Sequence, residues 1–190
     1  MGYNALSNNL TDNNCTAIGW EAARDANGAS DVTAVGAYAL QQLTTGDYNV
    51  AVGQAAAYST TTGSYNVAIG LHSLSANQTG ARNTAVGYHA LYSFTSNDNT
   101  AVGYNALESV TTGTPNTAVG KDCAAKITTG GDNCALGLGA MYNTTTGDRN
   151  VAVGRDALQS NTTGQNNVII GSYAGDGYTG ASGNTIIGDS

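Results

Sequence analysis

The sequence has little charge, proline and cysteine, and each shortage narrows the classes of protein to which it can belong. Charged residues make up 10% of the 190 residues, and proline and tryptophan occur once each. No apolar run in the sequence approaches the roughly 20 residues that a membrane-spanning helix needs, so we expect no membrane insertion. A net charge of −7 also disfavours nucleic acid and anionic membranes as partners.

The three cysteines, Cys15, Cys123 and Cys134, do not form the even-numbered set that a disulfide framework needs. Cys123 occupies a repeat position otherwise held by Ala or Ser, and Cys134 one held by Thr or Val. We therefore expect small, buried thiols, and the sequence leaves their redox state open. The first residues already follow the repeat described below, so they do not indicate a signal peptide.

What the sequence does have is a glycine that recurs every 17 residues, with one interval of 16 between Gly87 and Gly103. A fixed period of this kind is typical of stacked repeats, in which each unit contacts its neighbours. We therefore treat residues 1–190 as a single repeat array. The repeat glycines are Gly2, Gly19, Gly36, Gly53, Gly70, Gly87, Gly103, Gly120, Gly137, Gly154, Gly171 and Gly188.

The residues around each glycine predict a parallel β-solenoid of about eleven 17-residue coils, an all-β fold. The unit reads N-[TV]-A-[VI]-G-x-x-A-L, followed by a polar stretch and T-T-G. Seventeen residues are too few for two helices and a turn, and the β-branched residues before the glycine favour strand. We predict two short strands and two glycine turns per coil, with coils about 4.8 Å apart and a rod roughly 50 Å long.

An asparagine stands four residues before the glycine in nine consecutive units. Asparagine side chains stacked at the spacing of strands can hydrogen-bond to one another as a ladder. We predict a structural ladder from Asn49, Asn66, Asn83, Asn99, Asn116, Asn133, Asn150, Asn167 and Asn184.

The 16-residue interval coincides with a changed turn. There, Thr95-Ser96-Asn97 replaces Thr-Thr-Gly with one residue fewer in the unit. We predict that Asn97 takes the place of the turn glycine in the left-handed conformation.

The paired apolar residues in each predicted strand favour an oligomer. Ala and Val or Ile are adjacent, so in a strand they point to opposite faces, and both faces of the coil are apolar. We expect the alanine column, including Ala101 and Ala118, to lie at the contact with identical rods in a parallel homo-oligomer, most simply a trimer. A monomer with a wide flat core is the alternative. Neither end carries a polar cap, so we expect the array to be a segment of a longer fibre.

The string Asn66-Val67-Ala68-Ile69-Gly70 resembles the head repeat of YadA-like trimeric autotransporter adhesins. The longer unit Asn99–Leu107, with its Thr-Thr-Gly spacer, resembles repeat arrays of bacteriophage fibre and tail-spike proteins. The resemblance covers the whole chain, although this repeat is longer than that of the adhesin heads. It implies a left-handed parallel β-roll, trimeric, on a virion or cell surface.

No repeat position carries recognisable catalytic or cofactor chemistry, so we expect no enzyme, no cofactor and no metal site. Asp122 and Asp156 lie two coils apart without a predicted cleft between them, and His72 and His89 share a column that looks solvent-facing. Adjacent threonines point to opposite faces, which disfavours ice binding. Exposed aromatic rings can stack on sugars, and the candidates for glycan contact are Trp20, Tyr48, Tyr65, Tyr88 and Tyr104.

The sequence therefore predicts a structural and adhesive segment of a trimeric fibre, at the surface of a phage virion, that displays variable turns to a host or cell-surface receptor. The head of a bacterial surface adhesin is the main alternative. An ice-binding or glycan-binding solenoid is a more distant one.

Overall fold

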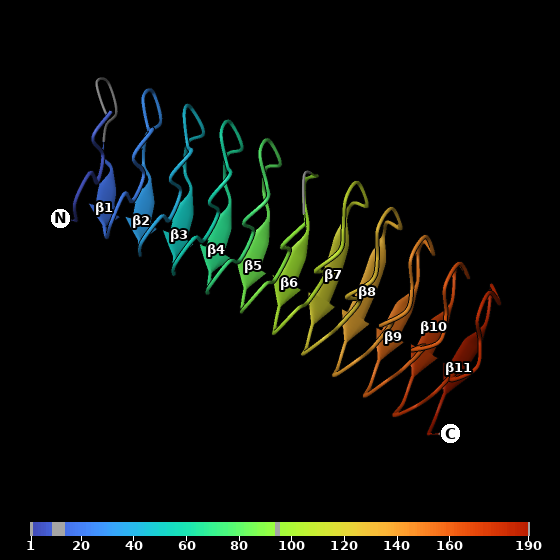
Figure 1. Cartoon of the computed structure of the whole chain (residues 1–190). Helices are drawn as coiled ribbons and strands as arrows, with labels where there is room; N and C mark the ends of the chain where they lie inside the picture. Colours follow the sequence, from blue (N-terminus) through green and yellow to red (C-terminus); the bar gives the residue numbers. More distant parts are fainter. Residues whose placement is uncertain (1, 9–13, 94–95, 190) are drawn as a thin grey trace.

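The computed structural model describes residues 2–8, 14–93 and 96–189, which form a rod of stacked coils (Figure 1). In these residues all regular structure is β, and each coil contributes one strand to a single parallel sheet with the order β1 to β11. The strands are β1 (Thr16–Ile18), β2 (Thr33–Val35), β3 (Val50–Val52), β4 (Val67–Ile69), β5 (Thr84–Val86), β6 (Thr100–Val102), β7 (Asn116–Val119), β8 (Asn133–Leu136), β9 (Val151–Val153), β10 (Val168–Ile170) and β11 (Thr185–Ile187).

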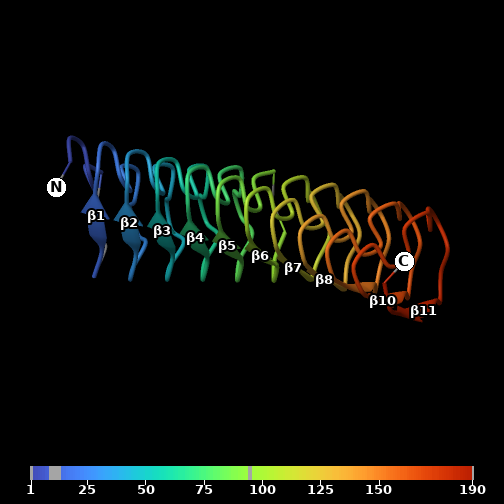
Figure 2. The same cartoon turned by 90° about the horizontal axis from the view of Figure 1, so that it is seen from below.

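The strands pair in a register that places each repeat position on its equivalent in the next coil. Ala34, for example, lies between Ala17 and Ala51 in the sheet. The parallel β-solenoid predicted from the 17-residue period is confirmed. Figure 2 shows that successive strands turn progressively about the rod, so β1 and β11 are seen from different sides. This progressive turn is the twist expected of hydrogen-bonded strands.

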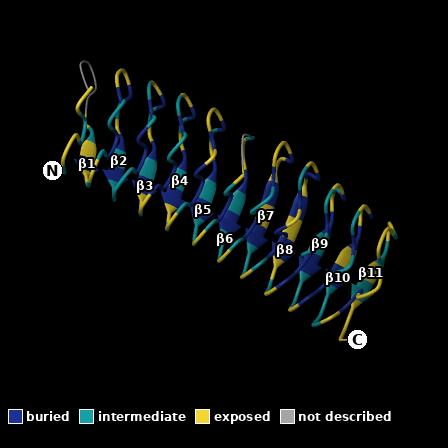
Figure 3. Cartoon of the chain, viewed as in Figure 1, coloured by how far each residue is buried: buried dark blue, intermediate teal, exposed yellow. Residues whose placement is uncertain are grey.

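The alanine of the strands β1 to β9 points into the coil, and Ile169 and Ile186 take its place in β10 and β11. Ala34, Ala51 and Ala68 have no exposed surface, whereas the residues on either side of them are half-buried or exposed (Figure 3). Ala101 and Ala118 are equally buried. The expectation that the alanine column meets a neighbouring rod is therefore wrong, because alternation along the strand turns the Thr or Val and the Val or Ile outward instead.

The repeat glycine is required by a close approach between coils. A Cβ placed on Gly70 would lie 2.6 Å from the carbonyl oxygen of Gly87, a separation that real Cβ atoms essentially never show. The same residue has φ of +130°, a conformation that side chains disfavour. Both facts hold along the column from Gly19 to Gly171, where φ lies between +130° and +140°.

The second apolar segment is a series of turns and not the strand that the sequence predicted. Three successive turns follow Gly36, closed by bonds from Ala39 N to Gly36 O, from Gln41 N to Tyr38 O and from Leu43 N to Leu40 O. Tyr38 and Leu40 have φ of +62° and +49°, the left-handed third residue of type II turns. Hydrogen bonds between coils, such as Leu40 N to Ala56 O at 3.0 Å, hold these turns in register.

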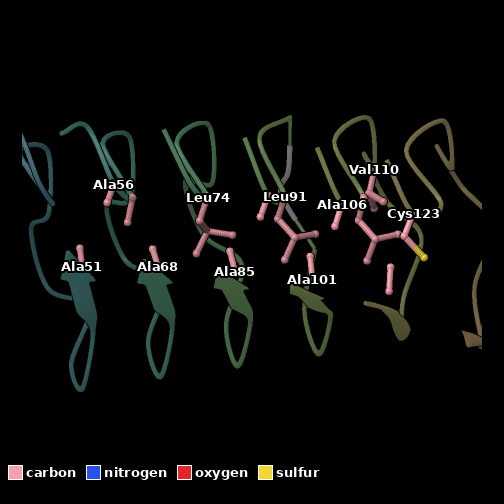
Figure 4. Close-up of a cluster of buried hydrophobic side chains, with 14 of the residues drawn as sticks. Ala51, Ala56, Ala68, Leu74, Ala85, Leu91, Ala101, Ala106, Val110 and Cys123 are labelled. Carbon is pink, nitrogen blue, oxygen red and sulfur yellow. The ribbon is translucent and has the colours of Figure 1, made fainter. Parts of the chain in front are cut away.

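The left-handed leucines explain why two adjacent apolar residues can both be buried. Ala39 and Leu40 have no exposed surface, and the same holds for Ala106 and Leu107. A positive φ at the leucine breaks the alternation of a strand, so its side chain joins the alanine inside the coil. The core therefore consists of two facing rows. The strand alanines form one row, and the leucines and other apolar residues of the turns form the other, as Figure 4 shows for Ala85, Leu91 and Ala101.

The Thr-Thr-Gly turn also differs from its prediction. Its glycines lack the predicted positive φ, and they are needed because the next coil lies close: a Cβ on Gly147 would be 2.5 Å from Gly164 O. In the short coil, Ser96 is the residue whose carbonyl lies against Gly80, and Asp98 (φ +62°) has the left-handed conformation, so the assignment to Asn97 is wrong. Thr95 lies outside the described residues.

We predict that Gly70→Ala destabilises the rod by about 3 kcal/mol or more, because the new methyl group meets the backbone of the next coil. The matched control is Gly188→Ala. Gly188 has φ of +140° in the same column, but no atom lies within 4 Å of its added Cβ. Urea unfolding followed by circular dichroism measures both. If both changes lowered the free energy of unfolding equally, the close approach between coils would not be the reason why this position is glycine.

Candidate functional site

The asparagine column forms a hydrogen-bonded ladder inside the rod. The Asn66 side chain donates from Nδ2 to Asn49 Oδ1 at 3.1 Å, and the backbone N–H of Asn66 donates to the same oxygen at 3.0 Å. Nδ2 of Asn66 also donates to the carbonyl oxygen of Gly80 in the turn of the next coil. One amide thus joins a strand, the strand before it and a turn. Buried amides satisfied in this way stabilise the stack.

The ladder changes its pattern at the short coil. Asn99 still donates its backbone N–H to Asn83 Oδ1, but its Nδ2 turns to the carbonyl oxygen of Asn97 at 2.7 Å. The regular pattern returns at Asn133, whose Nδ2 donates to Asn116 Oδ1 at 3.0 Å. The shorter unit is therefore accommodated in its turn and not in its strand, since β6 keeps the same register with β5 and β7.

The five aromatic residues proposed for glycan contact lie in two separate columns. Trp20, Tyr88 and Tyr104 each follow a repeat glycine, whereas Tyr48 and Tyr65 precede the asparagine. All five are exposed, but they stack on neighbours: Tyr48 on Tyr65 with centroids 4.9 Å apart, and Tyr88 on Tyr104 at 5.2 Å. In each parallel stack one ring face is covered by its partner, so these residues do not converge on one site.

A groove that the sequence did not predict extends over four coils. It lies on the side of the rod formed by the turns that follow the repeat glycines. It has a volume of about 390 Å³. Tyr38 and Tyr58 line one part of it, and His72 and Tyr92 line another. The signal in the sequence is the spacing of these residues: they occupy the second and fifth positions after the glycine, which the successive turns bring to the same side.

The two histidines lie next to each other, as their shared column predicted, within a larger aromatic cluster. The rings of His72 and His89 are 5.7 Å apart and nearly perpendicular, and His89 stacks on Tyr88 at 3.9 Å and on Tyr92 at 4.4 Å. Both imidazoles are half-buried. Among the described residues there is no group of three or more His, Cys, Asp or Glu that could hold a metal ion.

The carboxylates of Asp122 and Asp156 line a smaller cavity of about 200 Å³ on either side of Gly139. Asp156 is engaged by neighbouring side chains, accepting from Gln159 Nε2 at 2.8 Å and from Arg155 Nε at 3.3 Å. Asp122 accepts from Asn105 Nδ2 at 3.3 Å. A carboxylate oxygen of Asp156 lies where a side chain at Gly139 would begin, so the glycine makes room for this carboxylate, and the bonds from Gln159 and Arg155 hold it there.

The cysteines differ from one another in exposure. Cys123 is buried, and the loss of solvent around it raises the pKa of its thiol to about 12, which keeps it protonated and unreactive at neutral pH. Cys15 is half-buried, and its thiol lies 3.5 Å from the carbonyl oxygen of Ala29. Cys134 is exposed in β8, so the prediction that it lies in the core is wrong. It occupies an outward position of the strand.

No protein-family model, curated protein sequence or solved structure matches the chain. In the part of the chain that the structure describes, no helix has the length and apolar character required to cross a membrane.

We predict that Asn133→Ala destabilises the rod by about 3 kcal/mol. The change removes two bonds that Nδ2 donates, to Asn116 Oδ1 and Gly147 O, and two that Oδ1 accepts from Asn150. The control is Asn143→Ala, which removes a single exposed bond from Lys126 and should change stability by less than about 0.5 kcal/mol. Thermal unfolding compares them, and a similar small effect of both changes would show that the ladder contributes little.

Proposed function

We propose that the chain is a rigid structural and adhesive segment of a homo-oligomeric virion fibre, most simply a parallel trimer, whose variable columns meet a host or cell-surface receptor. The observation that carries the proposal is the outward face of the sheet. The core of each coil is filled by inward alanine together with leucine or another apolar residue, yet the opposite face of the same strands also carries a continuous column of Val, Ile or Leu beside a column of Thr, Val or Cys.

Two columns of uncharged residues make up this outward face. Ile18, Ile69 and Leu136 have 53%, 40% and 47% of their surface exposed. Apolar surface that continues over the length of a rod marks an interaction site, because soluble monomers rarely leave such a surface in water. The columns are Thr16, Thr33, Val50, Val67, Thr84, Thr100, Thr117, Cys134, Val151, Val168 and Thr185, and Ile18, Val35, Val52, Ile69, Val86, Val102, Val119, Leu136, Val153, Ile170 and Ile187.

A second copy of the same chain fits this face better than an unrelated partner. Each coil presents Thr, Val or Cys in one column and Ile, Val or Leu in the other at the same spacing, so parallel rods in register bring equivalent positions together in every coil. A closed ring of identical rods would cover the face completely, and three is the simplest number that encloses a central axis. The progressive turn of the strands in Figure 2 would then wind the rods around one another.

The remaining sides of the rod support an adhesive role. The positions directly after the glycine hold residues as different as Trp20, Gln54, Lys121 and Arg155, on a backbone that is the same in every coil. A constant scaffold with variable exposed positions suits recognition. The resemblance of the unit with its Thr-Thr-Gly spacer to phage fibre arrays favours a virion over a bacterial surface.

We predict that Ile69→Asp reduces the solution mass of the oligomer without unfolding the coil. Ile69 is exposed on the outward face, so only the contact between chains would place three carboxylates together in an apolar axis. Leu71→Asp is the matched control, since Leu71 has a similar exposure (39%) but lies beyond the strand.

Light scattering should give a mass of three chains for the wild type and for Leu71→Asp, and a smaller mass for Ile69→Asp with an unchanged circular dichroism spectrum. A monomeric wild type, or an Ile69→Asp variant that keeps the mass of the wild type, would contradict the proposal.

A further inference from the structure

The groove of about 390 Å³ has a volume within the range of small-molecule sites, about 300–1,000 Å³. Its floor is made of small residues, Ala55 and Ser75, in columns where neighbouring coils carry large aromatic residues. Tyr38 and Tyr92 belong to coils that are three steps apart, or about 14 Å along the rod at the spacing of strands. An elongated molecule lying along the rod therefore fits the groove better than a compact one.

The aromatic residues of the groove form two perpendicular pairs, although Tyr92 is also stacked on His89, with centroids 4.4 Å apart and planes at 23°. Tyr38 and Tyr58 meet edge to face, with centroids 6.5 Å apart and planes at 76°. His72 and Tyr92 meet in the same way, at 6.2 Å and 84°. In each perpendicular pair the edge of one ring covers a face of the other ring only, whereas a parallel stack covers one face of both rings. Aromatic faces are the surfaces on which the C–H groups of a sugar ring pack.

The polar groups of the groove are neutral hydrogen-bonding groups. Gln54, Ser59 and Ser75 contribute an amide and two hydroxyls, and the lining residues include no Lys, Arg, Asp or Glu. His72 Nδ1 is buried and has no hydrogen-bond partner among the described residues. A buried nitrogen without a partner gains a hydrogen bond when the ring turns toward the groove, where a ligand hydroxyl can meet it as donor or acceptor according to its tautomer.

We propose that this groove binds a neutral saccharide chain, with sugar rings against the tyrosines and sugar hydroxyls bonded to His72 and the neighbouring polar side chains. This inference rests on the proposed adhesive function, because it names the chemical class of the receptor that the rod would bind. Tyr88 and Tyr104, which the sequence suggested for glycan contact, join the groove through the stack on His89 and Tyr92. They lie beyond the lining residues, on the side of Tyr92, whereas Tyr38 and Tyr58 line the groove directly.

The first experiment applies the whole chain to an array of neutral and acidic oligosaccharides that includes maltohexaose, cellohexaose, mannohexaose and hexagalacturonate. The best neutral oligosaccharide is then titrated into protein with ¹⁵N-labelled histidine. The chain has two histidines, so His89→Asn assigns the spectrum. We expect binding to neutral oligosaccharides and a shift of the His72 ring nitrogens in the titration.

Two variants change the groove without touching the sheet. Ala55→Tyr fills the floor with the residue that the same column carries at Tyr38, whose φ of +62° is close to the +53° of Ala55. Tyr58→Ala removes one aromatic face. Each should weaken binding at least about tenfold, in line with the loss of a packed aromatic contact. The matched controls, Asn4→Tyr and Tyr142→Ala, make the same kinds of change in the same columns outside the groove and should bind like the wild type.

Binding to no neutral oligosaccharide, a preference for hexagalacturonate, or an Ala55→Tyr variant that binds like the wild type would each overturn the inference. The oligomer separates this failure from that of the proposed fibre. A trimer that binds no saccharide would overturn the groove alone, and a monomer that binds maltohexaose or its relatives through the groove would overturn the fibre alone.

Discussion

The close stacking of backbone on backbone at the repeat glycines is the constraint on which the rest of the structure depends. At this column the carbonyl oxygen of one coil occupies the space that a side chain of the coil before it would need. A residue other than glycine would force the coils apart or out of register. A nearly constant period follows, because each coil must return the chain to the same point before the next glycine, and the 16-residue unit between Gly87 and Gly103 also does so. The asparagine amides and the turn threonines, such as Thr61 with Gln78 O, then tie the coils together.

This constraint also determines which surfaces remain for function. The inward alanines and the leucines or other apolar residues of the turns fill the coil, and the Val and Ile that alternate with the strand alanine point outward. They form a continuous apolar column on one side of the rod, beside a column of Thr, Val and Cys. On the other sides the backbone is equally uniform, but the side chains change from coil to coil. A groove arises where small residues such as Ala55 fall between larger ones such as Tyr38 and His72.

The sequence predicted the stacking correctly and the path within each coil only in part. A strict period and β-branched residues beside a glycine were enough for a parallel solenoid, and the spacing of asparagines was enough for a column of amides. The second strand was a wrong prediction because Leu40 and its equivalents have positive φ, which residue type alone does not indicate for leucine. The inward alanine was missed because alternation gives two faces but does not say which of them is the core. The groove depends on which columns share a side, and this is set by those same left-handed residues.

The left-handed leucines are thus the feature that links the core, the outward face and the groove. Their backbone conformation can be measured directly. The distance between the backbone N–H and Hα protons of one residue is short at positive φ and longer in an extended strand. In an NMR spectrum of the chain, Leu74, Leu91 and Leu107, with φ between +50° and +52°, should show strong nuclear Overhauser effects between these protons. Ala85 in β5 should show a weak one. Weak effects at all three leucines would mean that the second segment is a strand, and the described core, outward face and groove would then be wrong together.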